Sequence, residues 1–141
     1  VVELYNRVKS NDPTNAAIIL VPIETSGLEA DATLIDADTL AALLSGATNE
    51  QTTMGRKTLT DADLAALPAP DGSNDRYEVS LPTVTWTAAS GNAISKIAVC
   101  YDPATTGGTD ANIIPLTMFD FAQTPSGADI QMTTGVFFRA A

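Results

Sequence analysis

Three short segments in the middle of the chain decide its fold: Tyr77-Glu78-Val79-Ser80-Leu81-Pro82, then Val84-Thr85-Trp86, then Ile94-Ser95-Lys96-Ile97-Ala98-Val99-Cys100-Tyr101-Asp102. Each segment is rich in β-branched and aromatic residues, which favour an extended backbone. Pro82 and the polar turn 89–92 separate the segments, because proline and glycine interrupt regular structure. The pattern predicts three successive strands, at about 75–81, 83–87 and 94–101.

The same interpretation extends toward both ends of the chain. A continuous apolar run lies upstream and two strand-like runs follow, which predicts further strands at about 16–23, 113–121 and 129–138. Pro82 and Pro115 are expected at strand ends or sheet edges, because proline donates no hydrogen bond to a ladder. Short strands joined by turns predict a mainly β chain, an antiparallel β-sandwich or barrel. A length of 141 residues indicates one domain, 1–141.

One segment has helical rather than β periodicity. Leu40, Leu43 and Leu44 fall on one face of a short helix predicted over 36–46, and this face would cover the sheet. An aspartate is the expected cap at its start, and a glycine stands at its end. The residues before this helix are expected to form a loop. One or two further helical turns are predicted within 60–67.

The N-terminal segment, residues 1–15, alternates weakly between apolar and polar residues and ends in a turn-forming run. This alternation predicts a short strand or an extended arm. Such an arm would add to the sheet edge of a neighbouring subunit. The partner-binding residues expected in this segment are Leu4, Tyr5, Arg7, Val8 and Lys9.

The balance of charge excludes two classes of partner. The chain has 17 acidic residues, 7 basic residues and no histidine, and its formal net charge is −10. Nucleic-acid binding requires a basic face, and an anionic membrane repels an acidic protein, so we expect neither partner. The acidity has two interpretations: it matches a basic patch on a partner, or it keeps the protein soluble at high concentration.

The sequence contains no arrangement of residues typical of an active site. Cys100 is the single cysteine, and without histidine it lacks the usual base that activates a thiol, so a packed core thiol is the simpler interpretation. Three carboxylate pairs lack the remaining residues of a calcium loop, and helix capping or solvation explains them better. These pairs are Glu29/Asp31, Asp36/Asp38 and Asp61/Asp63. We therefore predict no enzymatic activity, no cofactor and no metal.

The densest positive charge has both a binding and a structural interpretation. Arg56 and Lys57, together with Arg76, would clamp an acidic partner. Alternatively, these basic groups pair with a carboxylate of the same sheet, such as Glu78 or Asp75. Both interpretations are kept, with Arg56 and Lys57 as the candidate partner-binding residues.

The larger aromatic residues also have two interpretations. Trp86 is expected to anchor the core rather than to form a ligand platform. Phe137 and Phe138 are adjacent on a predicted strand, where neighbouring side chains point to opposite faces. One of the two is therefore expected to be exposed and to serve as an interface residue.

An ordered series of short motifs runs through nearly the whole chain. In order, the motifs are Leu4-Tyr5-Asn6, Asn49-Glu50, Met54-Gly55-Arg56-Lys57-Thr58-Leu59, Asn74-Asp75-Arg76, Val84-Thr85-Trp86, a strand with Ile97, Val99, Tyr101 and Asp102, Ile114-Pro115-Leu116, Asp120-Phe121, Thr124-Pro125-Ser126-Gly127 and Gly135-Val136-Phe137-Phe138-Arg139. A buried strand and a Leu-rich helix lie between the first two. The series resembles a family of small structural proteins in the virions of tailed bacteriophages, whose genes accompany those of the capsid.

The resemblance implies a capsid decoration (cement) protein with a β-sandwich or barrel body. It also implies the major capsid protein as partner, self-association into a homotrimer or another cyclic oligomer, and a place on the outer surface of the capsid after assembly in the host cytoplasm. No catalytic residue carries over from the family. The alternative is a structural module of the tail, neck or a fibre, which would bind the host.

Overall fold

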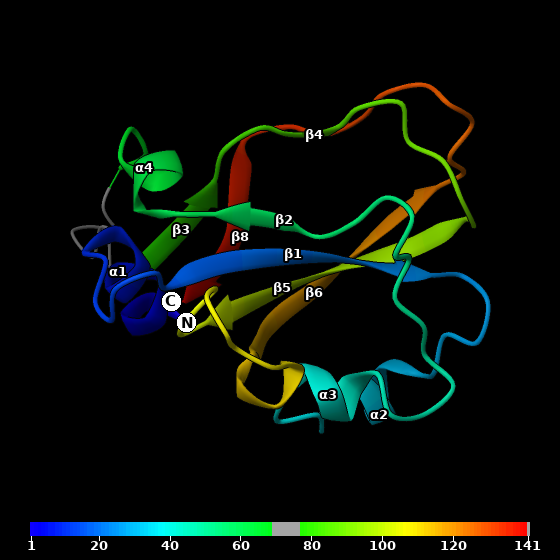
Figure 1. Ribbon diagram of the computed structural model, residues 1–141, viewed down its shortest axis with the longest axis horizontal. Coiled ribbons are helices and arrows are strands. Elements are labelled where there is room, and N and C mark those ends of the chain that lie inside the picture. The colour runs from blue at the N-terminus through cyan, green and yellow to red at the C-terminus, as the bar shows by residue number, and fades with distance from the viewer. Residues whose placement is uncertain (69–76, 141) are drawn as a thin grey trace.

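The structure, a computed structural model, describes residues 1–68 and 77–140 (Figure 1). It is mainly β with antiparallel sheets and few short helices, so the predicted fold class is confirmed. The elements in chain order are α1 (Val2–Lys9), β1 (Ala17–Glu24), α2 (Asp31–Leu34), α3 (Leu40–Leu43), β2 (Lys57–Leu59), α4 (Asp61–Leu64), β3 (Tyr77–Leu81), β4 (Val84–Trp86), β5 (Ile94–Asp102), the 3-10 helix η1 (Asp110–Asn112), β6 (Ile114–Gln123), β7 (Ile130–Met132) and β8 (Gly135–Ala140).

A four-stranded antiparallel sheet with the order β2-β1-β5-β6 forms the centre of the molecule. Its register is fixed by pairs such as Ile19 with Cys100 and Ala98 with Met118. Two antiparallel ribbons, β3-β8 and β4-β7, lie on one side of this sheet, and α2 and α3 lie on the other (Figure 1). The arrangement is sandwich-like. The ribbons form one layer, the central sheet forms the middle layer, and α2 and α3 cover its other face.

Strand β1 is buried on both faces because each face of the central sheet is covered. Alternate side chains of a strand point to opposite faces. Ile18 and Leu20 therefore enter the core beneath the ribbons, whereas Ile19 and Val21 enter the core beneath α2 and α3. This two-sided burial explains why the sequence of β1 is a continuous apolar run instead of an alternating one.

Proline occupies an interior position of β1 without breaking the sheet. The carbonyl of Pro22 accepts a hydrogen bond from the Gln51 N–H at 2.9 Å, so this side of Pro22 faces the segment before β2 and not β5. The missing proline N–H points to the same side, where β2 no longer runs alongside. Pro82 follows β3, and Pro115 lies in β6 at the end of the sheet, as predicted.

The predicted helix over 36–46 is shorter in the structure and begins later. Thr39, and not the expected aspartate, caps α3, with its Oγ1 accepting a hydrogen bond from the Ala42 N–H at 3.1 Å. Leu40 and Leu43 cover the sheet as predicted. The expected loop before this helix contains the single turn α2, which the sequence pattern missed.

Two other predictions concern short elements late in the described chain. The helical turn predicted within 60–67 is α4, where Thr60 and Asp63 form a reciprocal capping box. The strand predicted over 129–138 is wrong as one element, because it divides into β7 and β8, which pair with different partners.

The predicted strand or arm at the N-terminus is wrong. Residues Val2–Lys9 form the helix α1, in which Tyr5 and Val8, three positions apart, share the face that packs into the core. The Tyr5 hydroxyl donates a hydrogen bond to the Ser80 carbonyl at 3.0 Å and so fixes α1 to β3. The spacing of these two apolar residues is helical, and the weak alternation concealed it.

Most of the aromatic residues contribute to the core beneath the ribbons, and Tyr77 is exposed. Trp86 is buried, as predicted, and its indole N–H donates to the Gly55 carbonyl at 2.9 Å. Phe137 and Phe138 are both partly buried against this core, so the predicted exposure of one of them is wrong. The cause is a register shift between β3 and β8, where Val79 pairs with Phe138 and Ser80 with Val136. Such a bulge re-aims a side chain.

Candidate interaction surface

Strand β6 differs from the other long strands, β1 and β5, because it is an edge strand of the central sheet. It spans ten residues and pairs with β5 along one edge. Most of its side chains are only partly buried, and Ile114 is 40% exposed. A long edge strand presents backbone N–H and C=O groups to an incoming chain, so β6 is a candidate docking edge.

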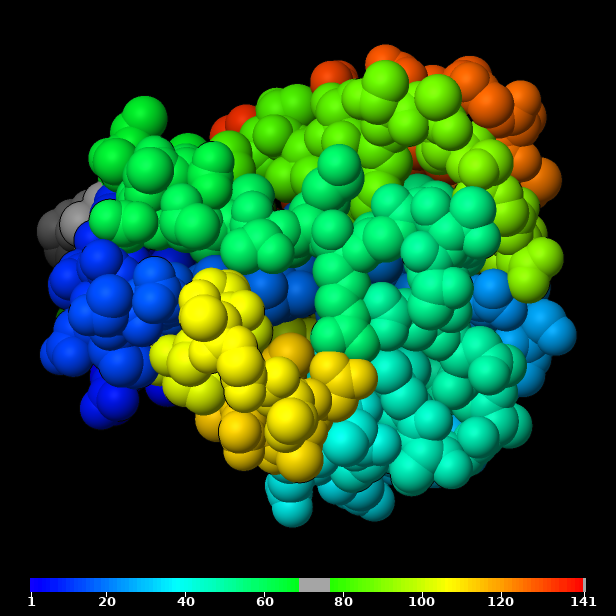
Figure 2. Space-filling model, in the orientation of Figure 1, coloured from blue at the N-terminus to red at the C-terminus, as the bar shows by residue number. Residues whose placement is uncertain are grey.

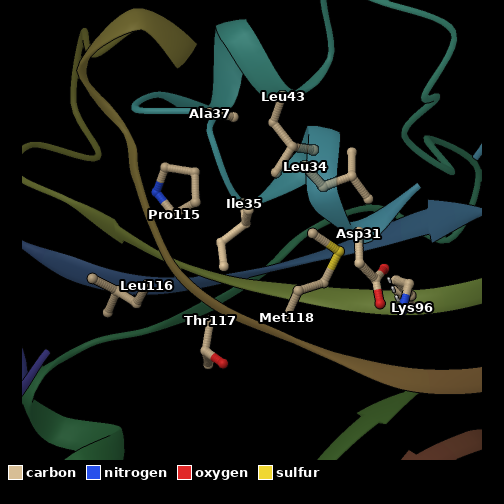
Figure 3. Close-up of a pocket in the computed structure, with 10 residues that line it drawn as sticks. All are labelled: Asp31, Leu34, Ile35, Ala37, Leu43, Lys96, Pro115, Leu116, Thr117 and Met118. Carbon is tan, nitrogen blue, oxygen red and sulfur yellow. Dashed lines mark ion pairs between the residues drawn. The ribbon is translucent and has the colours of Figure 1, made fainter. Parts of the chain in front are cut away.

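A groove of about 360 Å³ opens on one face of β6 (Figure 3). Helix α2 and the residues after it form one wall, and four successive residues of β6 form the other. The lining residues are Asp31, Leu34, Ile35, Ala37, Leu43, Lys96, Pro115, Leu116, Thr117 and Met118. We call this space the helix-side groove. Ile35 reaches over it from the end of α2 and is 83% exposed.

A small ionic cluster stands at the mouth of the helix-side groove. The Lys96 ammonium is 3.1 Å from Asp31 and 2.5 Å from Asp120. The hydrogen bond to Asp120 is the main cause that raises the pKa of Lys96 above its ordinary value, and the bond to Asp31 adds to it. The lysine side chain is 12% exposed, whereas the two aspartates are 81% and 87% exposed. The cluster therefore exposes two carboxylates to solvent, whereas its single cation is shielded.

A second groove, of about 300 Å³, opens between β6 and the turn that joins β7 to β8. Its lining is almost wholly apolar and consists of Leu81, Phe119, Met132, Thr133, Gly135, Val136 and Phe137. We call it the ribbon-side groove. Val136 is 46% exposed at its rim.

The two grooves lie on opposite faces of the central sheet. Leu34, Leu43 and Met118 of the helix-side groove belong to the core beneath α2 and α3. Leu81 and Phe119 of the ribbon-side groove belong to the core beneath the ribbons. Strand β6 is thus flanked by an opening on each face.

On the helix side of the sheet, α3 fixes the position of the residue that precedes β6. The Leu40 N–H donates to the Ile113 carbonyl at 2.9 Å, which ties the start of α3 to the residue before β6. On the surface, the cyan segment of α2 and α3 lies beside the yellow-to-gold segment that leads into β6 (Figure 2). The helix wall of the groove is therefore anchored to the fold.

Arg56 is saturated by partners within the chain. Its guanidinium bonds both oxygens of Glu50 at 2.8 and 2.6 Å, and both oxygens of Asp110 at 2.6 and 2.9 Å. These bonds raise the pKa of Arg56 and lower the pKa of the Asp110 carboxyl below its ordinary value. The structural interpretation of this arginine therefore fits the geometry, although its partners are not the acids named from the sequence.

The other basic candidates are placed as follows. Lys57 is partly buried on β2, opposite Leu20 of β1. Glu78 pairs with Arg139 at 2.7 Å. Asp75 and Arg76 lie outside the described residues.

The N-terminal candidates are divided by α1 into buried and exposed side chains. Tyr5 and Val8 are fully buried and Leu4 is partly buried, so these three side chains hold α1 in place. Arg7 pairs with Glu3 along the helix at 3.2 Å, and the Lys9 ammonium donates to the Leu67 carbonyl at 2.6 Å. The candidate residues at the N-terminus and at Arg56 and Lys57 do not form one site.

Cys100 and the carboxylate pairs have structural positions. Burial raises the pKa of the Cys100 thiol to about 12, and the side chain lies in the core, as predicted. Asp63 completes the capping box of α4, and Asp31 begins α2. Within residues 1–68 and 77–140, no three His, Cys, Asp or Glu side chains are grouped to hold a metal ion. Over the same ranges, no helix has the length and apolar character to cross a membrane.

No family model, curated protein or solved structure matches the chain. The assignment of its function therefore rests on its own sequence and structure. The surface at β6 was missed by reasoning from the sequence, although a strand over 113–121 was expected. Pro115 was the one available signal, because proline is confined to edges and strand ends.

Proposed function

We propose that this chain is a non-catalytic virion structural protein, a capsid decoration protein that bridges subunits of the major capsid protein and stabilises the head. The observation that carries the proposal is the edge of β6 with an open groove on each face. An anchored edge of this kind suits protein–protein contact. The ordered motifs that resemble phage virion proteins give the contact its setting.

The physical basis of such a role is avidity. A shell of capsomers repeats the same seam many times, and a small protein that spans a seam ties its neighbours together. Repeated copies stabilise the shell without a strong single contact. A cyclic oligomer would match the symmetry axes of the shell, and the outer surface of the capsid is the proposed location.

The charge of the chain agrees with a basic site on the shell. Its formal net charge is −10, and exposed acids stand at the helix-side groove. Complementary charge increases the rate of encounter and fixes orientation. Of the two interpretations of the acidity, the proposal therefore takes the match to a basic partner.

The test is co-sedimentation of the purified protein with expanded, undecorated capsids of the phage that encodes it. Saturable binding, with a copy number tied to capsomers or symmetry axes, would support the decoration role. A folded protein that does not bind the shells would contradict it and would direct the search to the tail, neck or a fibre. Circular dichroism on the same sample shows whether the protein is folded.

A further inference from the structure

Among the described residues, no strand pairs with the outer edge of β6. This edge and the two grooves beside it together specify the kind of chain that fits there. An added strand continues the ladder with its backbone, and its side chains alternate between the two faces of the sheet. Residues in odd positions would thus enter one groove and residues in even positions the other. The chemistry of each groove then selects each set.

The ribbon-side groove selects apolar side chains. Its walls are made by Leu81, Phe119, Met132 and Phe137, with Val136 at the rim, and none of its lining residues carries a charge. Burial of an apolar side chain there is favourable in proportion to the area removed from water.

The helix-side groove selects long basic side chains. Most of its lining is apolar, Asp31 lines it with an exposed carboxylate, and the exposed carboxylate of Asp120 pairs with its lining residue Lys96. A lysine or arginine places its aliphatic stem along an apolar wall and keeps its charged end in water. The charged end would then lie near the carboxylates of Asp31 and Asp120, both of which pair with Lys96.

We infer that β6 accepts, by β-strand addition, an extended segment of a partner protein in which basic and apolar side chains alternate. The inference deepens the proposed function and rests on it for the source of the segment, the capsid shell. A second copy of this chain fits poorly, because it brings the same acidic surface and the same Pro115 and Asp120 on its own edge. A neighbour's N-terminus is not the occupant either, since Val2–Lys9 is a docked helix.

The test uses the full chain and a blocked synthetic peptide, as long as β6, of alternating valine and lysine. Three matched peptides serve as controls: alternating valine and glutamate, the valine and lysine residues rearranged as two blocks, and the first peptide with alternate backbone nitrogens methylated. We expect the alternating valine–lysine peptide to bind at least about tenfold more tightly than each control. Binding should protect the β6 amides from hydrogen exchange.

A pair of variants tests the electrostatic part. Asp31→Asn combined with Asp120→Asn should weaken binding of the valine–lysine peptide by up to about tenfold. The control Glu3→Gln combined with Asp12→Asn changes the net charge equally, lies near the N-terminus outside both grooves, and should leave binding unchanged.

Three results would overturn the inference: no binding of the peptide, equal binding of any of the three control peptides, or protection located away from β6. The peptide assay needs no capsid, and the sedimentation assay needs no peptide. Shell binding without peptide selectivity would therefore refute the strand-addition mode alone. Peptide selectivity without shell binding would instead refute the decoration role.

Discussion

Strands β1 and β6 belong to the same sheet, yet their surroundings are opposite. The side chains of β1 from Ala17 to Ile23 are buried, and β1 has β5 along one edge and β2 along the other. Strand β6 is longer, lies at the end of the sheet and has an open groove on each face. The difference indicates separate roles: β1 holds the fold together, and β6 leaves its outer edge and both faces accessible, as the proposed function requires.

The largest expected effect tests the stabilising half of this comparison. Ile18→Ala in β1 removes a side chain with no exposed area, and should lower the free energy of unfolding by about 2–5 kcal/mol. Ile114→Ala in β6 starts from a side chain that is 40% exposed, and should cost less than about 1 kcal/mol. Urea unfolding followed by Trp86 fluorescence measures both. Equal losses from the two variants would break the comparison.

The next effect concerns the cluster that links the two regions. Glu50 forms a β-bridge with Ile23 of β1, Asp110 lies in η1 just before β6, and Arg56 joins the two acids. Arg56→Met breaks charged hydrogen bonds and leaves two carboxylates without their cation. It should therefore destabilise the protein by about 1.5–3 kcal/mol at neutral pH.

The pH dependence of this cluster has a definite sign. Arg56 lowers the pKa of Asp110 below its ordinary value of 3.8, so the folded state gains stability above that pH. The gain is lost as the pH falls below this value, through the lower pKa of the folded state. The stability difference between the wild type and Arg56→Met should accordingly shrink in acid. A difference that stays constant down to pH values well below 3.8 would show that pairing with the ionised Asp110 is not the source of the stabilisation.

The smallest expected effect on stability is that of a change in the helix-side groove beside β6. Ile35→Ser should change the free energy of unfolding by less than about 0.5 kcal/mol, because Ile35 is 83% exposed. It should nevertheless weaken shell binding several-fold, since it removes apolar surface from the helix-side groove. Tyr77→Ser is the matched control, an exposed aromatic residue outside both grooves. Similar losses of binding in both variants would place the contact elsewhere.

Much of the strand pattern was predictable from the sequence because it depends on neighbouring residues. The run 16–23 and the strand 94–101 are specified by β-branched residues, and the turns that flank them are specified by Gly and Pro. The helix α1 was missed although Val1, Leu4, Tyr5 and Val8 stand at helical spacing, because this short segment was interpreted from its weak apolar–polar alternation instead. Their burial depends on β3, far away in the chain.

The candidate site was much less predictable, for a reason of topology. Whether a strand is central or at an edge depends on the pairing order of the whole sheet, and the local pattern is ambiguous. Pro115 indicated an edge, yet Pro22 lies inside the central strand β1. The ionic cluster also joins residues that are distant in the sequence, Asp31, Lys96 and Asp120. The Arg56 cluster shows the same limit, because its partner Asp110 lies 54 positions away.

Hydrogen exchange read by mass spectrometry, on the protein alone and on the protein bound to expanded capsid shells, tests the separate roles of β1 and β6 most directly. Amides of β1 should be protected in both samples, because local stability is greatest where burial and pairing are complete. Amides of β6 should exchange faster in the free protein and become protected on the shell. Protection that appears on α1 or β8 while β6 is unchanged would show that the shell is contacted elsewhere than at β6.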